Sequence, residues 1–96
     1  MQIDTQKLSV VQNTSENRFE IRIDDLIAVS QYRLNGNVIT FYHVEVPLEW
    51  EGQGIGGLLA KAGLDYAREN SLKVIPACPF VAAYIRRHPE YRDLSA

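Results

Sequence analysis

Four of the six glycines in the chain lie within one short stretch: Gly52, Gly54, Gly56 and Gly57. Glycine has no Cβ atom, so the backbone at these positions can come close to a ligand and can adopt a positive φ. The residues that follow have helical spacing, and the first N–H groups of a helix lack intrahelical partners and lie at the positive end of its dipole. This combination predicts a binding site for an anion, most naturally a phosphate group.

Three strands are expected before this glycine turn. Polar and apolar residues alternate along three segments, a period typical of half-buried strands. The predicted strands span residues 18–23, 26–34 and 38–46. Asn35-Gly36 favours a tight hairpin between the second and the third, so these strands should form an antiparallel meander. Residues 1–12 are expected to form either an edge strand or a loose arm.

A βαβ unit is expected around the glycine turn. Apolar residues recur at helical spacing across residues 54–70 and predict one apolar stripe, formed by Ile55, Leu58, Leu59, Ala62 and Tyr66. A short apolar strand follows at 72–75, and Pro79 is well placed in the first turn of a second helix. The two strands of the unit should be parallel, with a right-handed crossover. The predicted fold class is therefore α/β with a mixed sheet, and a cleft should open beside the glycines where these strands diverge.

The composition limits the class of protein. A chain of 96 residues with 46% hydrophobic residues suits a single domain, which we expect to span residues 1–96. The net charge of −2 argues against nucleic acid as a partner, since such proteins usually present a basic face. No apolar run approaches the roughly 20 residues that span a bilayer, so no membrane association is expected. Cys78 is the only cysteine, which fits a reducing compartment, and we expect a cytoplasmic protein without a metal site.

Two well-known phosphate-binding patterns fit less well. Gly52, Gly54 and Gly57 match the dinucleotide pattern G-x-G-x-x-G, but a Rossmann domain needs further parallel strands and an acidic residue at the end of the second strand. Here a meander precedes the turn, and residues 75–78 contain no carboxylate. The chain also lacks the Gly-Lys-Ser/Thr of a Walker A loop. A glycine-rich loop that only packs at a helix start stays open as the alternative.

Several separate motifs resemble the GNAT superfamily of N-acetyltransferases. Residues 51–56 are similar to the superfamily's phosphate turn, Arg/Gln-x-x-Gly-x-Gly/Ala, which opens a helix after a strand. Residues 43–47, 78–81 and 88–91 are similar to the His-x-Glu-Val-Pro, Cys-Pro-Phe-Val and His-Pro-Glu-Tyr segments of a short, stand-alone GNAT-like family. The resemblance covers about residues 18–93. It implies a reduced GNAT fold, with an antiparallel meander, a βαβ unit and a C-terminal helix.

The resemblance also implies that the chain binds acetyl-CoA. In such proteins the backbone N–H groups of the glycine turn hold the diphosphate, and the pantetheine arm runs between the diverging strands. The cofactor-binding residues that it implies are Val44, Val46, Glu51, Gly52, Gln53, Gly54, Ile55, Gly56, Gly57 and Cys78. Amides of Val44 and Val46 would hydrogen-bond the arm, and the thioester would point toward Cys78. Glu51 departs from the usual Arg or Gln, and its carboxylate adds a Coulomb cost beside a phosphate.

Three residues are candidates for the chemistry of acetyl transfer. His43 and Glu45 should share a strand face with Ile39 and Phe41, and either could accept a proton from an amine. Cys78 follows the second parallel strand, where the thioester should end, and could act as a nucleophile or a proton donor. A purely structural role stays open for each of the three. His43 would then be a half-buried strand residue, Glu45 a solvated or paired residue, and Cys78 a small buried residue.

The resulting hypothesis is an acetyl-CoA-dependent N-acetyltransferase that moves the acetyl group directly to an amine in an open cleft. Tyr84 is a further candidate to donate a proton to the leaving thiolate. A non-catalytic module that binds CoA or acyl-CoA is the alternative, and a small interaction domain without a ligand is a third hypothesis. The sequence does not identify the acceptor, whether protein, peptide or small amine, nor the oligomeric state.

Overall fold

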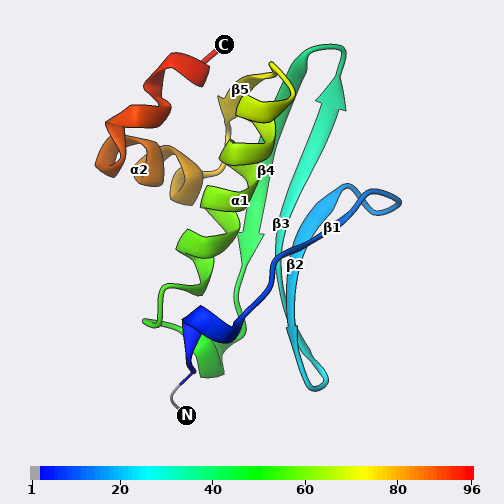
Figure 1. The fold of residues 1–96 in the computed structure, drawn as a ribbon, viewed down its shortest axis with the longest axis vertical. Helices are drawn as coiled ribbons and strands as arrows, with labels where there is room; N and C mark the ends of the chain where they lie inside the picture. Colours follow the sequence, from blue (N-terminus) through cyan, green and yellow to red (C-terminus); the bar gives the residue numbers. More distant parts are fainter. Residues whose placement is uncertain (1–2) are drawn as a thin grey trace.

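A five-stranded mixed sheet forms the frame of the molecule in the computed structural model, which describes residues 3–96 (Figure 1). The strands lie in the order β1-β2-β3-β4-β5, with the bounds Val11–Asn13 (β1), Arg18–Ile23 (β2), Leu26–Asn35 (β3), Val38–Glu45 (β4) and Lys73–Pro76 (β5). The α-helices are Ile55–Glu69 (α1), between β4 and β5, and Pro79–Arg87 (α2), after β5. Short 3-10 helices span Thr5–Lys7 (η1), Leu48–Trp50 (η2) and Pro89–Leu94 (η3).

The first four strands form an antiparallel meander, and β4 pairs with β5 in parallel. A parallel pair needs a crossover connection, and α1 supplies it. This arrangement confirms the predicted α/β fold with a mixed sheet, and β1 is the expected edge strand. Several observed ends differ from the predicted ones by a residue, which is the usual uncertainty of such boundaries. Residues 1–2 of the predicted arm lie outside the described part of the chain.

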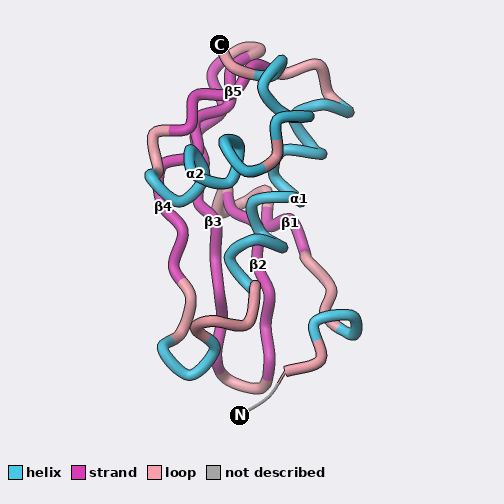
Figure 2. Tube along the Cα trace, turned by 90° about the vertical axis from the view of Figure 1, so that its left-hand side faces the viewer, coloured by secondary structure: helices cyan, strands magenta, loops and turns pink. Residues whose placement is uncertain are grey.

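Both α-helices lie on the same face of the sheet (Figures 1 and 2). The core contains the largest fully buried side chains, among them Trp50, Phe41, Ile21, Ile39, Ile55, Leu59, Leu64, Val74 and Val81. Neither α-helix covers the opposite face of the sheet. The molecule therefore has one helix-covered sheet face and one open sheet face.

The buried side of α1 differs from the predicted apolar stripe. The buried residues are Ile55, Gly56, Leu59, Ala60, Gly63, Leu64 and Ala67. Leu58, Ala62 and Tyr66 are only half-buried and pack at the margin of the core. The stripe is confirmed at Ile55 and Leu59, whereas the other three residues lie beside it, because the helix also turns small residues such as Ala60, Gly63 and Ala67 toward the sheet. Small residues let the helix backbone approach the strands closely.

Gly63 shows how close this approach is. A Cβ atom at this position would lie 2.6 Å from Cε1 of Phe41 on β4. The Phe41 side chain is fully enclosed in the core, so its ring has little room to move aside. The lack of a side chain at Gly63 therefore lets α1, with the glycine turn at its N-terminus, pack directly on β4.

Replacement of Gly63 by alanine should destabilise the fold. The added methyl group overlaps the buried Phe41 ring, and overpacking of a core costs about 1–3 kcal/mol. The matched control is Gly57→Ala in the same helix, where the new Cβ would meet Tyr84 at an ordinary 3.7 Å. Alanine is favoured over glycine in a helix by about 1 kcal/mol, so the control should be at least as stable as the wild type. Urea unfolding measures both free energies, and equal stabilities of the two variants would contradict this packing.

A β-bulge in β4 resets the alternation of its side chains. Tyr32 of β3 pairs with Phe41, whereas the preceding Gln31 pairs with His43, so Tyr42 is an extra residue in β4. An extra residue bends the strand and moves all later side chains to the other face. The bulge therefore decides which residues at the end of β4 face the helices.

Beyond the bulge, Val44 returns to the helix-covered face, paired with the buried Ser30. His43 and Glu45 consequently lie on the open face, with side chains 50% and 72% exposed. The prediction that they share a face with Phe41 was wrong, because it assumed unbroken alternation along the strand.

Candidate functional site

β4 and β5 stay paired only along the first half of β4. Their last paired residues are Phe41 and Pro76, and the Phe41 carbonyl also accepts a hydrogen bond from the Cys78 N–H at 2.9 Å. The chain then enters α2, whereas β4 continues to Glu45. Within residues 3–96, no strand pairs with this last part of β4 on the β5 side. Its backbone is therefore available there to a ligand.

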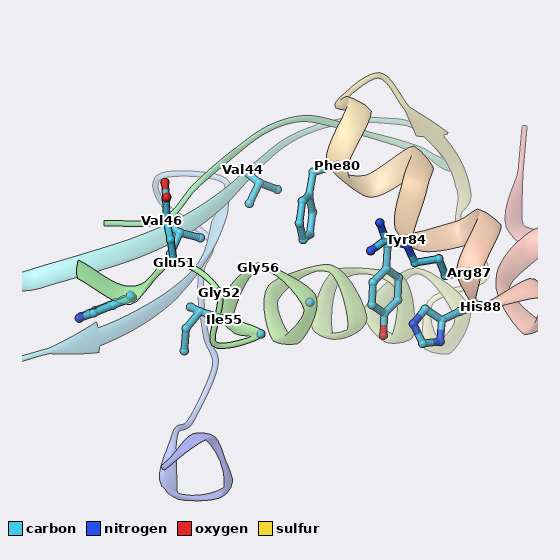
Figure 3. A pocket seen from close by; sticks show the side chains of 13 residues that line it. Val44, Val46, Glu51, Gly52, Ile55, Gly56, Phe80, Tyr84, Arg87 and His88 are labelled. Carbon is cyan, nitrogen blue, oxygen red and sulfur yellow. The ribbon is translucent and has the colours of Figure 1, made fainter. Parts of the chain in front are cut away.

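A cavity of about 590 Å³ lies beside the unpaired part of β4 (Figure 3). Its walls come from the end of β4, from the glycine turn with the first turn of α1, and from one side of α2. The lining residues are Val44, Val46, Trp50, Glu51, Gly52, Gly54, Ile55, Gly56, Gly57, Phe80, Tyr84, Arg87 and His88. Segments that are far apart in the sequence thus form one concave surface.

The glycine turn has the left-handed backbone that glycine permits. Gly52 and Gly54 have φ values of 78° and 82°. Nothing lies within 4 Å of where their Cβ atoms would be, so the backbone conformation, and not crowding, favours glycine here. Gly54 is the N-cap of α1, and no side chain caps the helix. The turn therefore presents uncapped N–H groups and the positive end of the helix dipole to the cavity.

Phe80 forms one wall of the cavity. Figure 3 shows its ring between Val44 of β4 and the first turn of α1. A Cβ atom on Gly56 would lie 2.7 Å from Cζ of this ring. The Phe80 side chain is 42% exposed and so, unlike Phe41, has room to move. Glycine at position 56 leaves space for the ring beside the turn.

Comparison with known proteins identifies the family. A family model described as GCN5-related N-acetyl-transferase matches residues 18–94. The chain belongs to this family. The NMR solution structure of a GCN5-like protein from Staphylococcus aureus superposes on this GCN5-related chain with a TM-score of 0.74 at 35% identity, covering 96% of this chain and 91% of that one. The likeness confirms the GNAT fold that the sequence motifs implied.

Curated proteins from several vertebrates are also similar to this GCN5-related chain. Protein NATD1 of Gallus gallus is 28% identical over 86 residues, which cover 85% of this chain and 77% of the relative. Protein NATD1 of Danio rerio is 28% identical over 93 residues, which cover 91% of this chain and 84% of the relative. The similarity therefore extends over most of both chains.

Most of the predicted cofactor-binding residues line the cavity of this GCN5-related protein. These residues are Val44, Val46, Glu51, Gly52, Gly54, Ile55, Gly56 and Gly57. Gln53 lies outside the lining, and its side-chain oxygen accepts a hydrogen bond from the Ile3 N–H at 2.6 Å. This bond connects the N-terminal segment to the glycine turn.

Cys78 also lies outside the cavity lining of this GCN5-related protein. Its side chain is 6% exposed and belongs to the hydrophobic core, directly after the divergence of β4 and β5. Within residues 3–96, the thiol has no hydrogen-bond partner that would act as a base. This environment favours the reading of Cys78 as a small buried residue.

His43 and Glu45 lie together on the open face of the sheet, outside the cavity. His43 Nε2 is 3.6 Å from Glu45 Oε1. The two side chains adjoin the part of β4 that has no partner on the β5 side, but they approach it from the face opposite to the cavity. A ligand in the cavity would meet them only through the gap between the strands.

The sequence reasoning missed four residues of the cavity wall: Trp50, Phe80, Arg87 and His88. The helical spacing of α2 contained part of the signal. Val81 and Ile85 form its buried side, whereas the residues that line the cavity recur every three or four positions on another side. Only the position of α2 beside the glycine turn shows that this second side belongs to the site.

Tyr84 and His88 stack on the α2 side of the cavity, with ring centroids 4.1 Å apart. Burial raises the pKa of Tyr84, so its phenol stays protonated at neutral pH. Figure 3 shows the hydroxyl directed away from Val44. Tyr84 is therefore poorly placed to protonate a group that β4 holds.

A hydrogen-bond network supports this wall of the cavity. Asp65 on α1 accepts hydrogen bonds from the Tyr91 hydroxyl and the Lys61 ammonium group, both at 2.7 Å. Burial alone would raise the pKa of Asp65, but these two hydrogen bonds outweigh it and hold the pKa below its usual value. The ionised carboxylate thus links α1 to η3, the segment that follows α2.

Within residues 3–96, no group of three or more His, Cys, Asp or Glu side chains could hold a metal ion. The same part of the chain contains no helix that is long and apolar enough to cross a membrane.

Proposed function

We propose that this protein is an acetyl-CoA-dependent N-acetyltransferase that transfers the acetyl group directly to an amine. The observation that carries the proposal is a single cavity that joins an uncapped glycine turn to an unpaired stretch of β4. Membership of the GCN5-related family supports the same activity. Acetyl-CoA contains a diphosphate and a long amide-containing arm that ends in a thioester, and each part has a counterpart in the cavity.

The diphosphate would bind at the glycine turn. Backbone N–H groups at the start of α1 can donate to phosphate oxygens, and the helix dipole favours the negative charge. Gly52 and Gly54 leave open space where side chains would stand. Glu51 also lines the cavity, so its carboxylate would lower the affinity for the phosphates without blocking the turn.

The pantetheine arm would lie along β4. Val44 and Val46 present an apolar surface to the cavity, and the adjacent backbone has no strand partner on that side. Amide groups of the arm can therefore hydrogen-bond to the strand edge, in the same way as an extended peptide adds to a sheet. This path leads toward Phe41, where β4 and β5 begin to diverge.

The acetyl group would lie at that divergence, and the amine would approach from the open face of the sheet. His43 is the base that we propose, with Glu45 beside it at 3.6 Å. The amine nitrogen attacks the thioester carbonyl carbon, the C–S bond breaks, and one amine proton passes to His43 directly or through water. The CoA thiolate would take up a proton from solvent. No helix covers this face, so the site is open enough for an amine of a protein, a peptide or a polyamine.

The substitution Gly54→Ala should weaken the binding of CoA. The new methyl group would stand in the open space of the turn, and the φ of 82° strains alanine by about 1–2 kcal/mol. Gly36→Ala is the matched control, since Gly36 has a φ of 60°, has nothing within 4 Å, and lies in the β3–β4 hairpin outside the cavity. Both variants should lose similar stability. Only Gly54→Ala should lower the affinity for CoA, by about tenfold or more, as measured by calorimetry.

Two outcomes of this titration would count against the proposal. Equal CoA affinity in the wild type and both variants would exclude the glycine turn as the phosphate site. Failure of millimolar CoA to raise the melting temperature of the wild type would favour an interaction domain without a ligand, since a ligand that binds the native state must stabilise it.

The substitution Glu51→Gln should strengthen the binding of CoA. Removal of a solvent-exposed carboxylate a few ångströms from a phosphate relieves a repulsion of about 1 kcal/mol, which corresponds to about fivefold in affinity at low salt. Glu49→Gln serves as the control, because Glu49 is exposed in the neighbouring 3-10 helix and does not line the cavity. The gain should shrink as the salt concentration rises. An equal gain in both variants would mean that only the net charge of the protein matters.

Incubation with acetyl-CoA and a panel of amines should release free CoA thiol. We expect His43→Ala to lower kcat by about 100-fold, the usual contribution of a positioned base, and Glu45→Gln to lower it less, while both variants keep their CoA affinity. Without an amine, the mass of the protein should stay unchanged, because direct transfer forms no acetyl-cysteine. An added acetyl group on Cys78 would overturn direct transfer. Tight CoA binding without turnover for any amine would favour the non-catalytic CoA-binding module.

A further inference from the structure

The open face of the sheet carries a pattern of charges that the proposed function leaves unused. Strand residues that alternate with the buried core lie on this face, and neither α-helix covers it (Figures 1 and 2). The chain has ten Lys and Arg residues against twelve Asp and Glu residues, yet four of these cations and only two of these carboxylates belong to the strands on this face. They are Arg18, Arg22, Arg33 and Lys73, with Glu20 and Glu45. The open face is therefore basic, although the protein as a whole is acidic.

Arg18 and Glu20 neutralise each other. The Arg18 guanidinium group and the Asn13 amide both donate hydrogen bonds to the Glu20 carboxylate. These bonds hold the pKa of Glu20 below its usual value, so the carboxylate stays ionised as the partner of Arg18. The strand charges that remain for a ligand on this face are three cations and one carboxylate: Arg22, Arg33, Lys73 and Glu45.

Arg33 is held in place by an aromatic ring and not by an acidic side chain. Its Cζ atom lies 4.4 Å from the centroid of the Tyr42 ring, close enough for a cation–π contact. Within residues 3–96, its guanidinium group forms no hydrogen bond or ion pair. Tyr42 is the extra residue of the β-bulge and directly precedes His43, so the bulge brings the ring and the proposed base to the same face. An arginine ordered in this way keeps its planar fork of donors available to a carboxylate.

The charges nearest to the gap between the strands are arranged along β4. Glu45 and His43 lie together at its end, where the amine would approach. Arg33 lies about 7 Å along the sheet from them, because it is two residues from Gln31, the partner of His43 in β3. Lys73 lies on β5 about 7 Å farther, at the next residue pair on this face, and its ammonium group donates only a long hydrogen bond of 3.4 Å to a backbone carbonyl. The order along β4 is therefore a carboxylate, the base and two cations.

We propose that the open face binds an extended acidic peptide, whose amine is the acetyl acceptor and whose carboxylates, two and four residues from the amine-bearing residue, pair with Arg33 and Lys73. The inference rests on the proposed function, since it assumes that the amine reaches the thioester through the gap beside His43. Alternate side chains of an extended peptide lie on one side about 7 Å apart, which is the spacing of these groups. Glu45 attracts the ammonium form of the amine, so the charges of such a peptide complement those of the face. A polyamine is cationic throughout, and Arg33 and Lys73 would repel it.

Acetyl transfer to two sets of lysine peptides tests this arrangement. Each peptide has a blocked N-terminus and one lysine. The first set carries Asp, Asn or Lys at the second position on both sides of this lysine, with Asn at the fourth positions, and the second set carries the same changes at the fourth positions. In each set the wild type should have a KM for the Asp peptide about fivefold below that for the Lys peptide, with similar kcat values. The difference should shrink as the salt concentration rises.

Charge-reversal variants assign each preference to one cation. Arg33→Glu should reverse the order of KM values in the first set and leave the second set unchanged, whereas Lys73→Glu should do the opposite. The matched control is Arg22→Glu, because Arg22 is an exposed arginine on the same face but lies on β2, opposite Ile27 and away from β4. This control should keep the wild-type order in both sets. All three variants should keep their CoA affinity and their circular dichroism spectrum, and a purely structural role of a residue would not reverse a preference between peptides.

The outcomes separate the two proposals. If no amine of any kind releases CoA thiol, the proposed function fails and the assignment of the acceptor fails with it. If acetyl transfer occurs but the KM values within each set are equal, the activity stands and the acidic acceptor is overturned. Equal effects of all three charge reversals would mean that only the net charge of the protein matters, which would also overturn it. A single-stranded RNA oligonucleotide that inhibits the reaction at concentrations below the KM of the Asp peptides would assign the face to nucleic acid instead.

Discussion

The hydrogen bond between the Phe41 carbonyl and the Cys78 N–H is the last link between β4 and β5, and the site depends on the end of pairing at this point. A parallel strand that continued alongside β4 would satisfy its backbone groups and fill the space beside the glycine turn. Instead, β5 ends at Pro76, which has no N–H to donate to a sheet, and the chain turns into α2. The end of β5 therefore leaves the edge of β4 without a partner on this side, and it places α2 beside the cavity as its third wall.

The bulge at Tyr42 acts together with this divergence. If the side chains alternated from Phe41 onward without a bulge, His43 and Glu45 would face α1, and Val44 would face solvent. The bulge instead turns an apolar side chain toward the cavity and places the two titratable side chains on the open face. The two halves of the proposed reaction, cofactor binding and proton removal, thereby fall on opposite sides of one strand. Such a separation keeps charged side chains away from an apolar path while leaving both within reach of the gap.

The glycines of the chain serve two different physical needs. Gly52 and Gly54 have a positive φ and nothing near their missing Cβ atoms, so they shape the turn and keep it open. Gly56 and Gly63 sit within the helix, where a Cβ atom would overlap an aromatic ring. The first pair therefore forms the anion site, and the second pair allows α1 to pack close enough to the sheet to position it. The two charged residues of the cavity lining come from different elements, with Glu51 beside the turn and Arg87 in the last turn of α2.

The sequence by itself determined the order of the elements, the hairpin at Asn35-Gly36, the glycine turn and the family. These features depend on local signals, such as alternation, helical spacing and residues that permit a positive φ, and on motifs that are contiguous in the chain. The tertiary structure alone decided which faces those elements present. The bulge at Tyr42 depends on the register between β3 and β4. The buried side of α1 depends on the Phe41 ring opposite Gly63, and the burial of Cys78 depends on the core around α2. Arg87 and His88 belong to the cavity lining for the same reason. Contacts between segments distant in sequence bring α2 beside the glycine turn, and no local sequence pattern predicts such contacts.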